Sequence, residues 1–141
     1  PQNKEIVDKW KVIMSKASAE HAGQTDANGR KRIVSRLEVL PPYTICTESY
    51  LLLDIFDNEE EAQNLKKYIR TCFTRFLLAS ILITQNIVRD KFKFVPIQNY
   101  KNNSDIDWSQ NIPDIDRQLY SKYNLSDDEI DFIEKMIKPM D

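Results

Sequence analysis

Hydrophobic and polar positions alternate in the first part of the chain, which predicts β-strands. Alternation over Val7–Ser18 is typical of a strand, because successive strand side chains point to opposite faces. The apolar runs Arg32–Leu40 and Thr44–Phe56 predict two more strands, separated by a Pro-Pro step. Lys and Phe alternate in Lys91–Gln98, which predicts a fourth strand.

From Asn58 onward the apolar positions recur every three or four residues, which predicts one long helix ending near Gln85. Asn58 is a favourable N-cap, and the three glutamates after it suit the positive end of the helix dipole. The buried face of this helix is expected to hold Leu65, Ile69, Cys72, Phe73, Phe76 and Ser80.

Two short helices are predicted after the polar stretch 99–111. The first starts at Pro113, a favoured first helical position, and the second at Ser126, which forms a capping box with Glu129. Their apolar stripes hold Ile115, Leu119 and Tyr123, and Ile130, Ile133 and Ile137. The order of elements predicts an α+β domain: a small mixed sheet packed on one long helix, with two short C-terminal helices.

The distribution of charge along the chain indicates more about a possible partner than the overall composition does. The chain has 141 residues, of which 41% are hydrophobic and 30% charged, an ordinary composition for one soluble domain. Residues 1–101 carry 16 Lys and Arg against 12 Asp and Glu, whereas residues 102–141 carry 4 against 10. A polyanionic partner is therefore expected to meet the first hundred residues and to be repelled by the tail.

Cysteine usage and hydropathy favour a cytoplasmic protein. Cys46 and Cys72 lie among apolar neighbours, so we expect buried, reduced thiols. With one histidine and no Cys-x-x-Cys motif, a zinc site is not expected. No apolar run reaches the roughly 18 residues of a membrane helix, and the charged start of the chain indicates no signal peptide.

The polar stretch 19–32 is the strongest candidate for a binding loop. It has no periodicity and contains both glycines of the chain, so we expect it to be exposed. Its residue types suit DNA, since Arg and Lys bind phosphate or guanine, and Asn and Gln bind adenine edges. The candidate nucleic-acid contacts in the stretch and its flanks are Lys16, His21, Gln24, Asn28, Arg30, Lys31, Arg32 and Arg36. The alternative is a solvated surface loop without a partner.

A second basic group follows the predicted long helix. Gln85, Lys91 and Lys93 are further candidate DNA contacts, and Arg89 adds positive charge beside them. They extend the first group only if the fold brings them beside it, and the alternative is an ordinary solvated strand face. The basic residues within the helix are expected to serve solubility and pairing with glutamates: Lys66, Lys67, Arg70 and Arg75.

Several segments, in colinear order from Trp10 to Met140, resemble one family. They are CTESYLLL, which starts at Cys46, FTRFL and FVPIQ, and the closing LYSKYNLSDDEIDFIEKMIKPM. Together they are similar to the carboxy-terminal region of adenine-specific DNA methyltransferases from bacterial type II restriction–modification systems.

The resemblance implies a region that recognises double-stranded DNA. It makes residues 1–101 a DNA target-recognition α/β core and residues 102–141 an acidic linker and two-helix tail packed on the same domain. The S-adenosylmethionine site and the catalytic residues are then expected in an upstream methyltransferase domain of the same polypeptide. The alternative is a protein-interaction module that docks a methyltransferase or restriction partner without touching DNA.

Residue chemistry argues against catalysis within these 141 residues. Pro41-Pro42-Tyr43 is most of the motif that holds the flipped base in amino-methyltransferases, but that motif needs an Asn or Asp acceptor before it, and Leu40 has none. We expect a rigid structural turn there instead. The sequence shows no glycine-rich cofactor loop, no set of metal ligands and no nucleophile–base pair. The aromatic residues Trp10, Trp108, Tyr43 and Tyr50 are expected in the core rather than stacked on bases.

Overall fold

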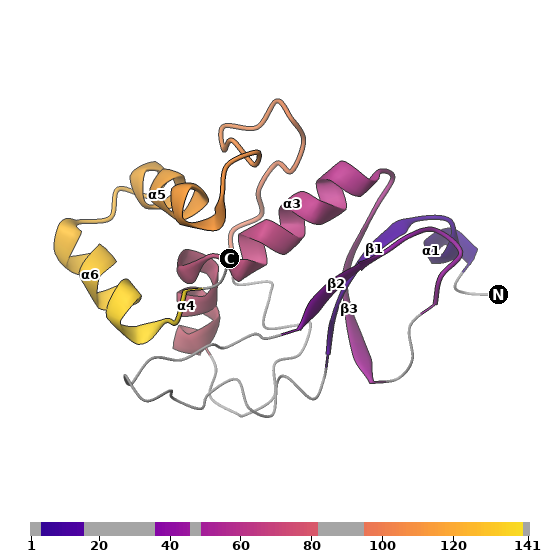
Figure 1. The fold of residues 1–141 in the computed structure, drawn as a ribbon, viewed down its shortest axis with the longest axis horizontal. Helices are drawn as coiled ribbons and strands as arrows, with labels where there is room; N and C mark the ends of the chain where they lie inside the picture. The colour runs from indigo at the N-terminus through magenta and orange to yellow at the C-terminus, as the bar shows by residue number, and fades with distance from the viewer. Residues whose placement is uncertain (1–3, 16–35, 46–48, 82–94, 140–141) are drawn as a thin grey trace.

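The computed structural model describes residues 4–15, 36–45, 49–81 and 95–139 and has the predicted α+β architecture (Figure 1). The described strands are β1 (Trp10–Ser15), β2 (Leu37–Leu40) and β3 (Tyr50–Phe56). The described helices are α1 (Lys4–Val7), α3 (Glu59–Arg70), α4 (Cys72–Ile81), α5 (Ile112–Lys122) and α6 (Asp127–Met136). None of these helices is long and apolar enough to cross a bilayer.

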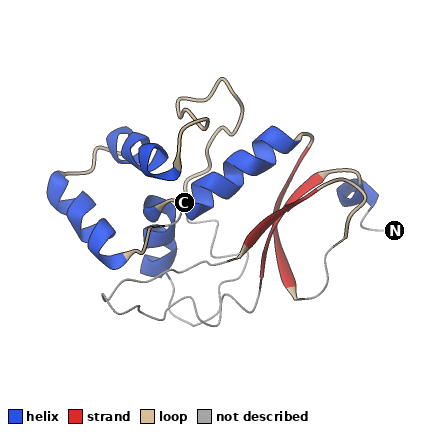
Figure 2. Ribbon diagram, in the orientation of Figure 1, coloured by secondary structure: helices blue, strands red, loops and turns tan. Residues whose placement is uncertain are grey.

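The three described strands form an antiparallel sheet in the order β2-β1-β3 (Figure 2). β1 is central because it pairs with both neighbours, with Met14 opposite Leu37 on one side and Leu51 on the other. Two ends of the sheet follow from this register. The Ser15 end holds Ser15, Arg36 and Tyr50, and the Trp10 end holds Trp10, Leu40 and Phe56. The described pairings are all antiparallel, whereas the sequence predicted a mixed sheet.

α3 packs across one face of the sheet and separates it from the other helices. Val12 and Met14 of β1 are fully buried against Ala62 and Leu65 of α3. Figure 1 shows α4, α5 and α6 grouped on the far side of α3 from the sheet. The apolar residues of α5 and α6 join the same core cluster: Ile115, Leu119, Tyr120, Ile133 and Ile137.

The predicted long helix is two helices that meet at Thr71. Thr71 has an extended backbone and its hydroxyl accepts from the Thr74 N–H at 3.1 Å, which caps the start of α4. The predicted cap at the other end is confirmed, since the Asn58 side chain accepts from the Glu61 N–H. The stretch from 82 to the predicted helix end near Gln85 lies outside the described residues.

The remaining helix starts agree with the sequence, while one strand does not. The capping box of Ser126 and Glu129 is present, and Pro113 lies in the first turn of α5 after the N-cap Asn111. Of the strand predicted at 91–98, only residues 95–98 are described, and they form no strand. Val95 and Gln98 are nevertheless buried, because they pack against the helices.

Candidate nucleic-acid interface

The stretch that holds most of the predicted DNA contacts begins and ends at one point of the sheet. The Ser15 N–H donates a hydrogen bond of 3.1 Å to the Arg36 carbonyl oxygen. This bond joins the two sides of residues 16–35, because β1 and β2 are antiparallel neighbours. The predicted contacts within that stretch lie outside the described residues: Lys16, His21, Gln24, Asn28, Arg30, Lys31 and Arg32. The geometry therefore gives the point of attachment, at the Ser15 end.

Arg36 is the predicted contact that the structure describes. Its side chain is 66% exposed, and its Nε lies 3.3 Å from Glu38 Oε1. An exposed ion pair of this kind contributes at most about 1 kcal/mol. The guanidinium at the Ser15 end can therefore leave Glu38 for a phosphate at little energetic cost.

The second predicted group, Gln85, Lys91 and Lys93, lies outside the described residues, as does Arg89. What is described is the helix that leads into it. Figure 1 shows the C-terminal end of α4 and the C-terminal end of β1 on the same side of the molecule, the lower side of the view. The chain therefore enters both candidate stretches from one side of the fold.

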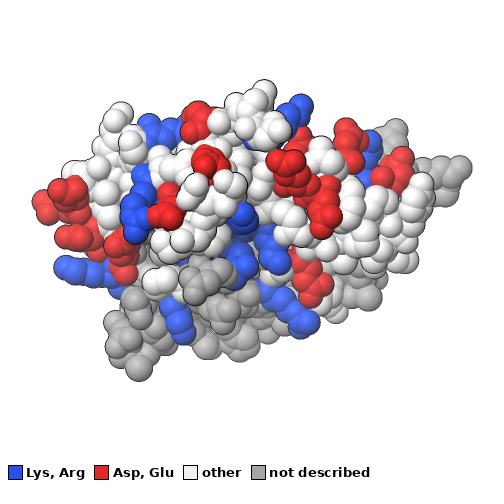
Figure 3. Space-filling model, turned by 45° about the horizontal axis from the view of Figure 1, so that its top comes forward, with Lys and Arg blue, Asp and Glu red and all other residues white. Residues whose placement is uncertain are grey.

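Charge on the described surface is unevenly distributed. In Figure 3, a few Lys and Arg side chains lie close together near the middle of the visible face with Asp and Glu side chains beside them, and a group of Asp and Glu side chains lies at the left end. The exposed acidic residues of α6 account for one acidic region: Asp127, Asp128, Glu129, Asp131 and Glu134. Exposed carboxylates of this kind repel a polyanion, and the expected polyanionic partner stays a prediction.

The basic residues of the helices do not all lie in solvent, contrary to the sequence prediction. Arg75 is fully buried, with its Nη1 donating to the Lys138 carbonyl at 2.6 Å and its Nε to the Arg70 carbonyl at 3.1 Å. Lys67 is half-buried and donates to the Trp108 carbonyl at 2.6 Å. Arg75 is buried because the whole first turn of α4, Cys72–Arg75, lies in the core, so its charge serves the fold.

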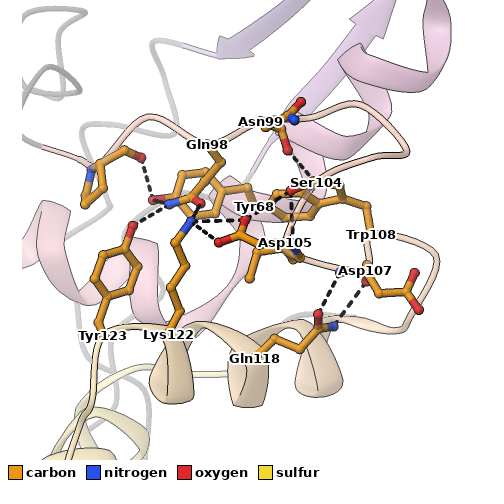
Figure 4. A network of polar contacts seen from close by, with 12 residues as sticks. Tyr68, Gln98, Asn99, Ser104, Asp105, Asp107, Trp108, Gln118, Lys122 and Tyr123 are labelled. Carbon is orange, nitrogen blue, oxygen red and sulfur yellow. Dashed lines mark hydrogen bonds and ion pairs between the residues drawn. The ribbon is translucent and has the colours of Figure 1, made fainter.

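A polar network that sequence reasoning missed joins residues 95–110 to α3 and α5 (Figure 4). The buried Gln98 amide donates to the Tyr123 hydroxyl at 2.7 Å and accepts from Lys122 Nζ at 2.7 Å. Lys122 also pairs with Asp105 Oδ2 at 2.9 Å, and the Tyr68 hydroxyl donates to the Pro96 carbonyl at 2.7 Å. Burial raises the pKa of Tyr68 to about 12, so the hydroxyl stays protonated.

A hollow of about 430 Å³ lies beside this network. Two of the polar side chains that line it are already hydrogen-bonded to the protein backbone. Asn64 donates to the Tyr100 carbonyl, and Gln118 both donates to and accepts from the backbone of Asp107. Two lysines and three carboxylates line it together: Lys67, Lys101, Glu60, Asp105 and Asp107. With carboxylates in the majority, this hollow is a poor site for DNA phosphate.

A second hollow, of about 270 Å³, is lined in part by Cys72, Asp116 and Glu134. Cys72 is buried and reduced, as predicted, and burial raises the pKa of its thiol to about 12. Such a thiol is a poor nucleophile at neutral pH. Cys46 lies outside the described residues. Among the parts of the chain that are described, no group of three or more His, Cys, Asp or Glu side chains is arranged to hold a metal ion.

The Pro-Pro-Tyr segment is a turn, as predicted, but its tyrosine is not buried. Tyr43 has a positive φ of 64°, and its side chain is 79% exposed. Trp108 lies in the core, and the partly buried Trp10 packs against the core, in agreement with the prediction for both tryptophans. The turn lies at the Trp10 end, opposite the end that carries the predicted DNA contacts.

No family model, no curated protein and no solved structure matches the chain. Function is therefore inferred from the quoted sequence segments and from the geometry of the two sheet ends.

Proposed function

We propose that the chain is the C-terminal DNA sequence-recognition domain of an adenine-specific DNA methyltransferase of a restriction–modification system. It holds the target duplex for an upstream catalytic domain of the same polypeptide, and S-adenosylmethionine binds in that upstream domain. The observation that carries this proposal is the hydrogen bond of 3.1 Å between Ser15 and Arg36. It anchors both sides of the one stretch that combines the chain's two glycines with four Lys and Arg residues.

The chemistry of that stretch supports contacts of two kinds. Lys16, Arg30, Lys31 and Arg32 supply charge for phosphates, which gives affinity without sequence preference. Gln24 and Asn28 have the paired donor and acceptor that read adenine in the major groove.

The test is duplex binding by the complete polypeptide, measured by fluorescence anisotropy over a range of salt concentrations. Replacing Arg30, Lys31 and Arg32 together by Ala is expected to weaken binding and to reduce the salt slope by about three, one unit for each lost phosphate contact. The matched control removes three charges from the tail, with Arg117, Lys135 and Lys138 replaced by Ala. Equal affinity and equal slope for the first variant and the unmodified protein would place the binding site elsewhere.

A protein-interaction module is the second candidate, and α6 is the feature that favours it. Its exposed acidic residues surround Phe132, which is 57% exposed and packs edge-on against Phe76. Deletion of residues 105–141 is not a usable test, because α5 and α6 supply part of the core. Reversing the charges of Asp127, Asp128 and Asp131 leaves the core intact. Loss of capture of a methyltransferase or nuclease partner by this variant, with unchanged DNA binding, supports the second candidate.

A further inference from the structure

The register of the sheet places Arg36 and Tyr50 on one face, on either side of Ser15. Ser15 pairs with Tyr50 of β3, and its N–H donates to the Arg36 carbonyl at the start of β2. Directly opposed residues of antiparallel strands point to the same face, so the side chains of Arg36 and Tyr50 lie on the Ser15 side of the sheet. The contact of Arg36 with Glu38, two residues along β2, agrees with this arrangement. The Cα atoms of Arg36 and Tyr50 are about 10 Å apart, which is two strand spacings.

This face of the sheet is turned away from α3. Met14, Leu37 and Leu51, one position further along the three strands, belong to the core cluster or pack against it beside α3. Because strand side chains alternate between faces, Arg36 and Tyr50 point to the opposite side. Tyr50 is partly exposed and lies outside the core cluster, so the sequence prediction of a core position is wrong for this residue.

The polar groups of both side chains are available to a ligand. Among the described residues, none forms a hydrogen bond with the Tyr50 hydroxyl. Arg36 pairs with Glu38 through side chains that are 66% and 39% exposed, so solvent competes for this pair. A guanidinium binds phosphate oxygens strongly, and a tyrosine hydroxyl donates to them. The two groups therefore match the chemistry of a nucleic-acid backbone.

The two ends of the sheet differ in charge, and the difference favours DNA at the Ser15 end. At the Trp10 end, exposed carboxylates lie just before β1 and just after β3: Asp8, Asp57, Glu59 and Glu60. Such a group repels phosphates. At the Ser15 end, the described charges of Arg36 and Glu38 pair with each other. The adjoining residues 16–35 add four Lys and Arg against two Asp and Glu.

We propose that Arg36 and Tyr50 bind the phosphate backbone of the target duplex beside the point where residues 16–35 attach, an inference that rests on the proposed function. Arg36 neutralises one phosphate, and Tyr50 donates a neutral hydrogen bond to another. Contacts of this kind fix the position of the duplex on the sheet and leave the reading of bases to other side chains. Glu38 pairs with the guanidinium when no DNA is bound and competes with phosphate for it.

The first test replaces Tyr50 by Phe in the polypeptide used to test the proposed function, with the same anisotropy measurement. Duplex affinity is expected to fall by about three- to tenfold, the effect of one lost neutral hydrogen bond. The salt slope is expected to stay unchanged, because a neutral donor releases no counterion. Tyr43→Phe is the matched control, since it removes the same hydroxyl from an exposed tyrosine at the Trp10 end.

The second test replaces Glu38 by Gln, which removes the competitor of the phosphate. Duplex affinity is expected to rise by about two- to fivefold, the range of an exposed ion pair. Because the predicted effect is a gain of binding, a loss of folding cannot produce it. Glu60→Gln is the control, since it removes an equal charge at the Trp10 end.

Failure of this inference and failure of the proposed function give different results. The inference is overturned if Tyr50→Phe binds as tightly as the unmodified protein or no more weakly than Tyr43→Phe. It is also overturned if Glu38→Gln binds no more tightly than Glu60→Gln. These results, together with weakened binding on replacement of Arg30, Lys31 and Arg32, reject the Arg36 and Tyr50 contacts alone. An absence of duplex binding by the unmodified protein rejects both proposals.

Discussion

Asp116 of α5 caps the first turn of α4 by accepting a hydrogen bond of 2.9 Å from the Phe73 N–H. Its second carboxylate oxygen accepts from the Cys72 N–H, also at 2.9 Å. Together with the Thr71 hydroxyl, Asp116 satisfies the first three N–H groups of a helix that begins inside the protein. A carboxylate at this position also interacts favourably with the positive end of the helix dipole.

Asp116 is expected to make the stability of the domain depend on pH. Burial is the main cause that raises its pKa from 3.8 to about 6, so the folded state holds this proton more tightly than the unfolded state does. The contribution of this group to stability is therefore full below about pH 4 and falls as the pH rises to about 6, by on the order of 3 kcal/mol. Urea unfolding of the chain between pH 4 and pH 8 measures this dependence.

The Asp116→Asn variant separates this effect from that of other carboxyl groups. Asp57 and Asp105 have lowered pKa values because of their lysine partners, and their contributions change with pH in the opposite direction. The difference between the unmodified protein and the Asn variant isolates the buried group. The exposed Asp131→Asn variant is expected to follow the unmodified protein. Parallel pH profiles for the unmodified protein and Asp116→Asn would contradict the prediction.

Replacement of Arg75 by Met is expected to destabilise the domain by about 2–4 kcal/mol. The buried guanidinium donates to the carbonyls of Arg70, Thr71 and Lys138, and Met fills similar space without a donor. Thermal unfolding measures the loss. Arg117→Met is the matched control, because Arg117 is exposed and pairs only with the neighbouring Asp114 within the described contacts. Similar losses for both variants would show that the Arg75 carbonyl bonds contribute little.

Gln98→Met is expected to cost about 2–3 kcal/mol and to loosen residues 95–110 selectively. The variant removes the amide that joins Tyr68, Lys122 and Tyr123 while keeping the side-chain length. Hydrogen exchange of the backbone amides from Gln98 to Gln110 reports the local effect. Exchange that rises equally throughout the domain would mean that the network has no special role in holding this segment.

Arg36→Ala tests the Ser15 end with the residue whose position is described. Folding stability is expected to change by less than about 0.5 kcal/mol, because the ion pair with Glu38 is exposed. Under the proposed function, the salt slope of duplex binding falls by about one unit. Lys135→Ala on acidic α6 removes the same charge far from the proposed interface. A slope that changes equally in both variants would indicate a general effect of charge.

Local sequence patterns were sufficient to predict the helices and strands that are determined by neighbouring residues in the chain. Asn58 and the pair of Ser126 and Glu129 start their helices as predicted, because each cap bonds to an N–H three residues away. Alternation predicted the strand β1, but β1 spans Trp10–Ser15 with both of its faces buried, and Val7, at the start of the predicted strand, lies in α1. The stripe of Ile115 and Leu119 followed from the helical period. For the candidate site, the sequence indicated residues whose types suit DNA. Most of these residues lie outside the described parts of the chain, so their roles remain predictions.

Tertiary structure decided the features whose causes lie far apart in the chain. The helix break at Thr71 is stabilised by Asp116, 44 residues from Cys72, so no local period shows it. Arg75 is buried and Tyr43 exposed, against prediction, and both make contacts distant in sequence: Arg75 donates to the Lys138 carbonyl after α6, and the Tyr43 N–H donates to the Val7 carbonyl of α1. The hydrogen bond from the Ser15 N–H to the Arg36 carbonyl likewise results from the pairing of β1 with β2. Sequence periodicity reports which face of an element is apolar, whereas only the packed fold determines what that face meets.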